Sequence, residues 1–226
     1  MRTLTKALQD ELTPENAIEL LKAGNQRFVN NLKVNRNLLQ QVNETSAGQY
    51  PFACILSCID SRTSAELIFD QGLGDIFSCR IAGNILNEDI LGSMEFACKL
   101  AGSKVIVVLG HTKCGAIKGA CDQVKLGNLT ALLSKVQPAI EAETITLGDR
   151  TGTNAAFVEN VAALNVHLTL KEIVKRSTVI SDLLKQRRIA LVGAMYNVET
   201  GVVEFFEDKQ ITVQNTAAEA NAMYQE

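Results

Sequence analysis

Short, almost wholly apolar runs recur along the chain and predict buried β-strands. Residues 52–58 and 104–110 are continuous apolar stretches of strand length, and residues 76–81 and 189–196 show a similar pattern. Continuous hydrophobicity, in contrast to the alternation of a half-exposed strand, is typical of parallel strands that are buried on both faces. We therefore expect these segments to form a parallel sheet.

Helical patterns separate the apolar runs. Thr13, Pro14 and Glu15 supply an N-cap, a proline at the first helical position and an acid in the first turn, and apolar residues follow at helical spacing. These signals predict an amphipathic helix over about residues 14–31. Further helices are expected over about residues 64–69, 88–100, 116–125 and 155–176. The alternation of strands and helices predicts a single α/β domain whose mostly parallel central sheet is flanked by helices.

The two ends of the chain complete this arrangement. A turn at residues 198–201 leads into the apolar residues 202–206, which we expect to form a short antiparallel edge strand. No internal repeat and no linker rich in proline, glycine or serine divides the chain, so we expect one domain over residues 1–226. Within it, a helical arm is expected over about residues 1–45 and the α/β core over about residues 50–210.

The composition narrows the class of protein. The 226 residues carry 22 Lys and Arg against 25 Asp and Glu, with 5% aromatic residues and no tryptophan. This balance offers neither a basic surface for phosphate groups nor a stacking platform for bases, so we expect no nucleic-acid partner. No apolar run approaches the roughly 18–20 residues of a membrane span. Because the first residues also lack the apolar stretch of a secretory signal, we expect no membrane association.

The cysteines indicate a reducing environment. Six cysteines are too few for a disulfide scaffold in a chain of this length, and several lie inside apolar segments, where a free thiol packs as a small hydrophobic side chain. We therefore expect a cytoplasmic protein. A chain of this length also buries enough surface to fold without a metal, so any bound metal is expected to serve chemistry rather than folding.

Candidate metal ligands follow two of the predicted strands. Cys58 comes directly after the first apolar run, and His111 and Cys114 follow the run at residues 104–110. Ligands bind beyond the carboxyl ends of strands in an open α/β sheet, so these three side chains meet if the two strands are neighbours. Two thiolates and one imidazole suit zinc, and three protein ligands leave the open fourth position of a catalytic zinc site.

Asp60 and Arg62 provide polar groups beside this predicted metal site. A carboxylate there can ligate the metal or accept a hydrogen bond from its bound water, and a guanidinium can hold that carboxylate by two bonds. Taken singly, Cys58 fits a core residue, Asp60 and Arg62 fit a surface ion pair, and the spacing of His111 and Cys114 fits a helix start. Their joint occurrence after two strands of one pattern favours the metal site.

A wholly structural zinc site is not favoured. The remaining cysteines offer no close Cys-x-x-Cys partner, and for them we expect packing roles; they are Cys54, Cys79, Cys98 and Cys121. The missing Cys-x-x-Cys pair also argues against a thiol redox protein.

The ordered set of motifs resembles the β-class carbonic anhydrases over most of the chain, from about residue 14 to about residue 206. The motifs that carry the resemblance are Cys58-Ile-Asp60-Ser-Arg62, Gln71-Gly-Leu-Gly-Asp75, Arg80-Ile-Ala-Gly-Asn84, Gly92-Ser-Met-Glu-Phe96 and Gly110-His111-Thr-Lys-Cys114-Gly115. The resemblance implies Zn²⁺ on Cys58, His111 and Cys114, with Asp60 and Arg62 as the catalytic pair. It implies the reversible hydration of carbon dioxide to bicarbonate and a proton by a zinc-bound hydroxide.

The resemblance also implies a substrate pocket and an assembly. Gln71, Phe96 and Gly115 are the expected pocket residues. The working unit is expected to be a homodimer or a dimer of dimers, with the amino-terminal helix lying over the neighbouring subunit and the pocket close to the interface. The sequence leaves open whether water or Asp60 takes the fourth position on zinc.

Two other functions remain compatible with the same ligands. One is a zinc hydrolase of another small linear substrate, such as carbon disulfide, on the same scaffold. The other is a non-catalytic zinc-binding interaction module, although this alternative leaves Asp60 and Arg62 without a role.

Overall fold

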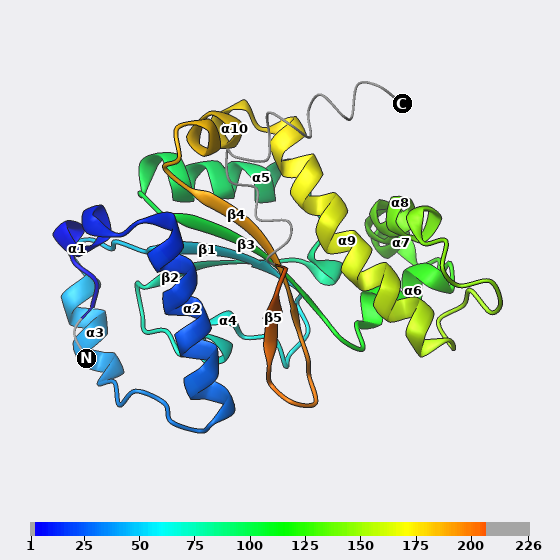
Figure 1. Cartoon of the computed structure of the whole chain (residues 1–226), viewed down its shortest axis with the longest axis horizontal. Helices are drawn as coiled ribbons and strands as arrows, with labels where there is room; N and C mark the ends of the chain where they lie inside the picture. The colour runs from blue at the N-terminus through cyan, green and yellow to red at the C-terminus, as the bar shows by residue number, and fades with distance from the viewer. Residues whose placement is uncertain (1–2, 207–226) are drawn as a thin grey trace.

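The computed structural model describes residues 3–206 and contains one five-stranded sheet with helices on both faces (Figure 1). In spatial order the strands are β2 (Ile76–Arg80), β1 (Ala53–Ser57), β3 (Val105–His111), β4 (Ala190–Tyr196) and β5 (Val203–Phe205). The first four run parallel to one another, and β5 pairs antiparallel with β4. The predictions of a single α/β domain, a mostly parallel sheet and an antiparallel edge strand are confirmed.

Burial on both faces of the sheet explains the continuous apolar runs. In β1, Ala53 and Ile55 join the core on one face, whereas Cys54 and Leu56 join the core on the opposite face. Every residue of β1 and of β3 is buried. Because both faces are dry, neither strand shows the polar alternation of a sheet that faces water on one side.

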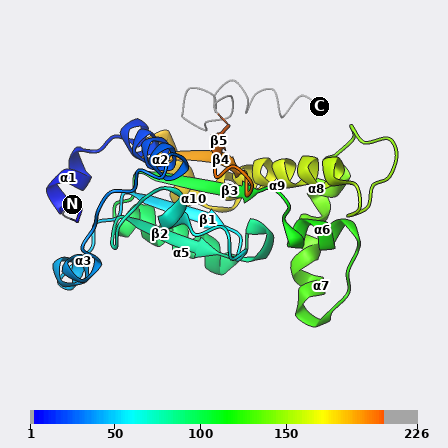
Figure 2. The same ribbon diagram turned by 90° about the horizontal axis from the view of Figure 1, so that it is seen from below.

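Two layers of helices cover the sheet. α2 (Pro14–Val29) and α4 (Ala65–Ile68) pack on one face, and α5 (Glu88–Glu95), α9 (Ala155–Arg176) and α10 (Thr178–Lys185) pack on the other. Figure 2 shows α2 and α5 on opposite sides of the sheet. The inner parallel strands β1, β3 and β4 are therefore shielded from water by helices, whereas the edge strand β2 is only partly covered.

A helical lobe lies beside the carboxyl end of β3. It consists of α6 (Gly115–Cys121), α7 (Gly127–Leu133) and α8 (Gln137–Ala142), which Figure 1 shows gathered at one end of α9. Apolar side chains of these helices share a cluster with the first half of α9. α6 is shorter than the helix predicted over residues 116–125, because Gln123 adopts the left-handed conformation, with φ 53°.

The amino-terminal segment is helical, as the sequence predicts. α2 begins at Pro14, and the side chain of Thr13 caps it by accepting a hydrogen bond from the backbone N–H of Asn16. Two short helices that the pattern did not predict lie on either side of it in the sequence, α1 (Lys6–Glu11) and α3 (Leu38–Thr45).

The boundaries of the predicted arm (about residues 1–45) and core (about residues 50–210) stay predictions, because residues 1–2 and 207–226 lie outside the described part of the chain. Among the described elements, α1, α2 and α3 precede residue 46, and β1 begins at Ala53. No helix within residues 3–206 is long and apolar enough to cross a membrane.

Candidate metal centre

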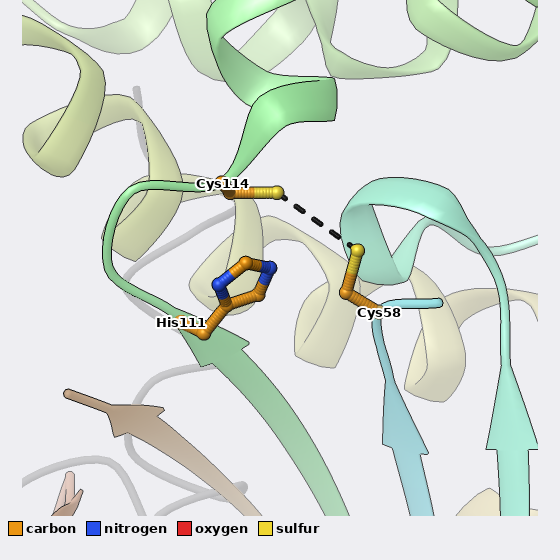
Figure 3. A group of neighbouring side chains, drawn as sticks. All are labelled: Cys58, His111 and Cys114. Carbon is orange, nitrogen blue, oxygen red and sulfur yellow. Dashed lines mark hydrogen bonds between the residues drawn. The ribbon is translucent and has the colours of Figure 1, made fainter. Parts of the chain in front are cut away.

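Three metal-ligating side chains meet at the carboxyl edge of the sheet (Figure 3). β1 ends at Ser57 and β3 ends at His111, and these two strands are hydrogen-bonded neighbours. Cys58 follows β1 at this edge, and the loop after β3 brings Cys114 to the same place. The ligand atoms of Cys58, His111 and Cys114 all lie within 4.8 Å of one another, and all three residues are buried. The structure therefore brings together the three ligands expected from the sequence.

The imidazole of His111 presents one nitrogen to this group. Its Nδ1 lies 2.8 Å from the carbonyl oxygen of Thr112, so Nδ1 carries the proton and donates this hydrogen bond. The other nitrogen, Nε2, is buried and has no hydrogen-bond partner. A buried, unpartnered lone pair is costly unless it binds a ligand, and a backbone carbonyl on the opposite nitrogen is the usual support of a metal-bound histidine.

The thiols of Cys58 and Cys114 are in hydrogen-bonding contact with each other. Their sulfurs lie 4.0 Å apart, and the backbone N–H of Gly83 donates a hydrogen bond of 3.3 Å to Cys58 Sγ. The Cys114 thiol, the His111 ring and this N–H together lower the pKa of Cys58 to about 4 despite its burial. The hydrogen bond with Cys58, burial and the negative charge on Cys58 raise the pKa of Cys114. A preformed thiolate beside a second thiol and a free imidazole nitrogen fits zinc.

Asp60 and Arg62 form a two-pronged ion pair next to the three ligands. The backbone N–H and Nε of Arg62 each donate a 2.9 Å hydrogen bond to Asp60 Oδ1, and Nη2 donates one of 2.7 Å to Oδ2. These bonds hold the pKa of the Asp60 carboxyl well below its usual range, although partial burial opposes them. The carboxylate is therefore charged at any physiological pH, and it is bound to Arg62 rather than grouped with the cysteines and the histidine.

Arg80, at the end of β2, fixes the backbone that carries these residues. Its Nε donates a 3.1 Å hydrogen bond to the carbonyl oxygen of Cys58, and its Nη2 donates one of 2.8 Å to the carbonyl oxygen of Asp60. Thr63 adds a third tie, because its hydroxyl donates to the same carbonyl of Cys58 at 3.0 Å. The segment after β1 is thus held from two sides.

Comparison with known proteins assigns the family. A family model described as carbonic anhydrase matches residues 53–203. The carbonic anhydrase 2 of Mycobacterium tuberculosis is 37% identical to this chain over 193 residues, which cover 83% of this chain and 90% of that protein. The solved β-carbonic anhydrase CcaA is 27% identical, with a TM-score of 0.66 over 85% of this chain and 86% of that one. The chain belongs to the β-class carbonic anhydrases.

Its fold also matches more distant members of the class. A tetrameric β-carbonic anhydrase of the ascomycete Sordaria macrospora superimposes with a TM-score of 0.63 at 24% identity, over 72% of this chain and 83% of that one. Zinc is the cofactor of this β-carbonic anhydrase, because the family uses zinc and the Cys58, His111 and Cys114 group fits it.

Helix α9 supports the centre through residues that the sequence pattern did not reveal. Asn165 donates a 2.9 Å hydrogen bond from Nδ2 to the carbonyl oxygen of Gly83, whose N–H in turn contacts Cys58. Glu159 accepts a 2.7 Å hydrogen bond from the backbone N–H of Lys113, in the loop between His111 and Cys114. Because α9 lies far from both strand ends in the sequence, only its position in the fold shows these contacts.

The three expected pocket residues of the carbonic anhydrase lie in different places. Gly115 begins α6 directly after Cys114, and a Cβ built on it would meet no atom within 4 Å. The ring of Phe96 packs edge-on against Phe77 with centroids 6.1 Å apart, and Phe96 is 53% exposed. Gln71 donates a 2.6 Å hydrogen bond to the carbonyl oxygen of Phe69. Among these three residues only Gly115 directly follows a candidate metal ligand, and the pocket roles stay predictions.

Proposed function

We propose that this β-carbonic anhydrase catalyses the reversible hydration of carbon dioxide to bicarbonate and a proton, with Cys58, His111 and Cys114 as the zinc ligands. The observation that carries the proposal is the lone pair of His111 Nε2, which is buried beside two cysteine sulfurs without a partner of its own. Zinc in such a site lowers the pKa of a coordinated water, to about 7 in the three-histidine carbonic anhydrase site, and so supplies a nucleophile near neutral pH.

Asp60 is proposed to orient the attacking water. A carboxylate has about four sites that accept hydrogen bonds, and Arg62 occupies three of them. The remaining site can accept one hydrogen bond from a water molecule, which directs the water's lone pair towards carbon dioxide. Because Asp60 is charged, it does not compete as a proton donor for that water.

Arg62 is proposed to keep the fourth position on the metal free for water. Its three hydrogen bonds hold the Asp60 carboxylate outside the group of ligand atoms. Moving Asp60 onto the metal would break a charged, two-pronged pair, and such pairs are among the stronger hydrogen-bonded contacts in proteins. The arrangement therefore favours water over Asp60 as the fourth ligand.

We propose a homodimer, or a dimer of dimers, as the working unit. Helix α3 exposes three apolar side chains, and the most exposed of them, Leu39, has 71% of its surface accessible; the three are Leu38, Leu39 and Val42. Covering such side chains with a second copy removes apolar area from water. Gln71, Phe96 and Gly115 are proposed to line a substrate pocket close to this interface.

Light scattering after gel filtration tests this assembly. We expect at least a dimer for the native chain and a shift towards monomer for Leu39→Glu, because the new charge opposes burial of α3. Leu147→Glu is the matched control, since Leu147 is 96% exposed in the loop after α8. A native chain that is monomeric at every concentration contradicts the proposal.

We also propose that the protein works in a reducing, cytoplasmic environment. All six cysteines are free thiols. Cys58 and Cys114 must stay reduced to act as ligands, and their sulfurs lie side by side. Disulfides are rare in reducing compartments, which suits such a pair.

The alternative functions are not favoured. A zinc hydrolase of carbon disulfide would keep the same ligands, but curated relatives that cover most of the chain are named as carbonic anhydrases. A non-catalytic zinc-binding module would leave the Asp60 and Arg62 ion pair without a functional role.

Stopped-flow measurement of carbon dioxide hydration, with zinc analysis of the same sample, tests the proposed activity. We expect one zinc per chain and a rate that rises from about pH 6 to about pH 9 as the nucleophile is generated. A chelator should remove zinc and activity together, and added zinc should restore both. Stoichiometric zinc without hydration at any of these pH values contradicts the proposal, and turnover of carbon disulfide by that sample would favour the hydrolase.

A further inference from the structure

A second pair of thiols lies inside the sheet, away from the metal centre. Cys54 in β1 and Cys79 in β2 have their sulfur atoms 3.9 Å apart. Both side chains face the apolar core that α5, α9 and α10 cover. Cys98, in the π-helical segment Phe96–Leu100 that continues α5, also belongs to this core. The proposed carbonic anhydrase reaction uses none of these three sulfurs.

The positions of Cys54 and Cys79 suit a shared metal ion better than a disulfide. Cys54 pairs with Phe77 and Cys79 pairs with Leu56, so the two cysteines occupy diagonal positions on neighbouring strands. In parallel strands about 4.8 Å apart, a two-residue offset of about 6.6 Å places the two Cα atoms roughly 8 Å apart, longer than an unstrained disulfide spans. The 3.9 Å between the sulfurs nearly equals the 4.0 Å between the sulfurs at the metal centre. An ion placed between the two sulfurs can therefore contact both.

The surroundings of this pair select a soft cation. Within the described chain, no histidine, aspartate or glutamate joins Cys54 and Cys79 in a group whose ligand atoms lie within 4.8 Å. Zinc takes four ligands, and the two sulfurs supply only half of them, so this pair suits zinc poorly. Cu(I) prefers sulfur donors and is satisfied by two thiolates. The contact with Cys54 lowers the pKa of Cys79, whereas the same contact and burial raise the pKa of Cys54, so the metal must displace a firmly held proton from Cys54.

A groove gives a cation access to the pair. Its volume is about 710 Å³, and Cys79 lies in its lining while Cys54 is fully buried. The carboxylates of Glu88 and Asp89 line the same groove and raise the local concentration of cations. Phe96, half exposed, provides an apolar wall. The groove therefore combines attraction for positive charge with a sulfur pair at its lining.

We propose that Cys54 and Cys79 form a second metal site, which binds one soft cation of the Cu(I) class independently of the zinc centre. Cu(I) replaces the thiol protons of the two cysteines, and these protons leave to solvent. No electron is transferred, because the ion arrives in the reduced state. The site does not depend on the carbonic anhydrase reaction, so the two proposals stand or fall separately.

Titration of the zinc-loaded protein with Cu(I) under anaerobic conditions, against a competing chromophoric Cu(I) chelator, tests the site. We expect one Cu(I) per chain, a thiolate-to-copper charge-transfer band in the ultraviolet, and zinc content unchanged. In Cys79→Ser the affinity for this Cu(I) is expected to fall by at least about a hundredfold, because one of the two ligands is gone.

Cys121→Ser is the matched control. It also removes one buried thiol, but Cys121 lies in α6 and belongs to a different apolar cluster, so its affinity should equal that of the native chain. Circular dichroism and zinc content confirm that each variant folds, and Cys79 is itself only partly buried. Equal Cu(I) affinity in Cys79→Ser and Cys121→Ser overturns the proposal, as does Cu(I) that binds only by displacing zinc.

Discussion

Two pairs of cysteine sulfurs in this protein have almost the same spacing but lie in different surroundings. The sulfurs of Cys58 and Cys114 are 4.0 Å apart at the edge of the sheet, and those of Cys54 and Cys79 are 3.9 Å apart within it. Both pairs involve β1, since Cys54 lies in this strand and Cys58 directly follows it. The spacing of the sulfurs therefore does not by itself distinguish the proposed catalytic pair from the other.

The two pairs of cysteines differ in the polar groups that surround them. Where the strands end, the N–H of Gly83 is free to contact Cys58, and His111 offers an unpartnered nitrogen. At Cys54, by contrast, the backbone groups of β1 and its neighbouring strands hydrogen-bond to one another, and apolar side chains from the helices surround the thiol. The carboxyl edge of a parallel sheet can therefore host a catalytic metal, whereas its interior offers sulfur alone.

Removing one sulfur from each pair should give the largest difference in zinc content and in the rate of carbon dioxide hydration. In Cys58→Ala we expect loss of zinc and a fall in carbon dioxide hydration of at least about a thousandfold, because a catalytic metal contributes several kcal/mol to the transition state. The matched Cys54→Ala change, four residues earlier in the chain, should keep zinc and turnover. Zinc analysis and stopped-flow rates measure both. Full activity in Cys58→Ala would show that Cys58 is not a ligand.

Asp60→Asn separates metal binding from catalysis at the proposed zinc site of Cys58, His111 and Cys114. The amide can no longer accept the same set of charged hydrogen bonds from Arg62, and it no longer presents a carboxylate to water. We expect turnover to fall by about a hundredfold, because the water loses the charged acceptor that orients it, while zinc content stays at one per chain. An unchanged turnover number would remove Asp60 from the mechanism.

Asn165→Ala tests the support behind Cys58. Without the Asn165 amide, the carbonyl of Gly83 loses its hydrogen bond and the N–H that contacts Cys58 is held less firmly. We expect zinc affinity to fall by about tenfold, as is typical when the residue that orients a ligand is removed. Asn160→Ala, on the same helix but bonded to Glu143, is the control. Equal zinc affinities for the two variants would contradict a positioning role.

Cys79→Ser should have the smallest effect on the enzyme. The side chain is partly exposed on the edge strand β2 and makes no contact with the zinc ligands, so we expect unchanged turnover and a loss of less than about 1 kcal/mol in the free energy of unfolding. Urea denaturation, with Cys121→Ser measured in parallel as the control, gives this loss in the free energy of unfolding. A clear fall in turnover would mean that the Cys54 and Cys79 pair is coupled to the zinc centre through β1.

Much of the fold was predictable because hydrophobic periodicity is a local property. The five predicted strands agree with the structure to within one residue at each end, and α9 (Ala155–Arg176) has the predicted bounds. Helices α1, α3, α7, α8 and α10 were not predicted. Each is at most eight residues long, and helices of that length depend on packing rather than on their own sequence for stability.

By itself, the sequence determined which side chains follow the ends of buried strands, and so it singled out Cys58, His111 and Cys114. The tertiary structure decided that β1 and β3 are neighbours, which turns that list into a group of ligands. It also placed Asn165 behind Gly83 and set Cys54 beside Cys79, contacts that no local pattern records. The physical reason is that burial leaves a periodic signal along the chain, whereas strand order and register arise only when the whole sheet packs.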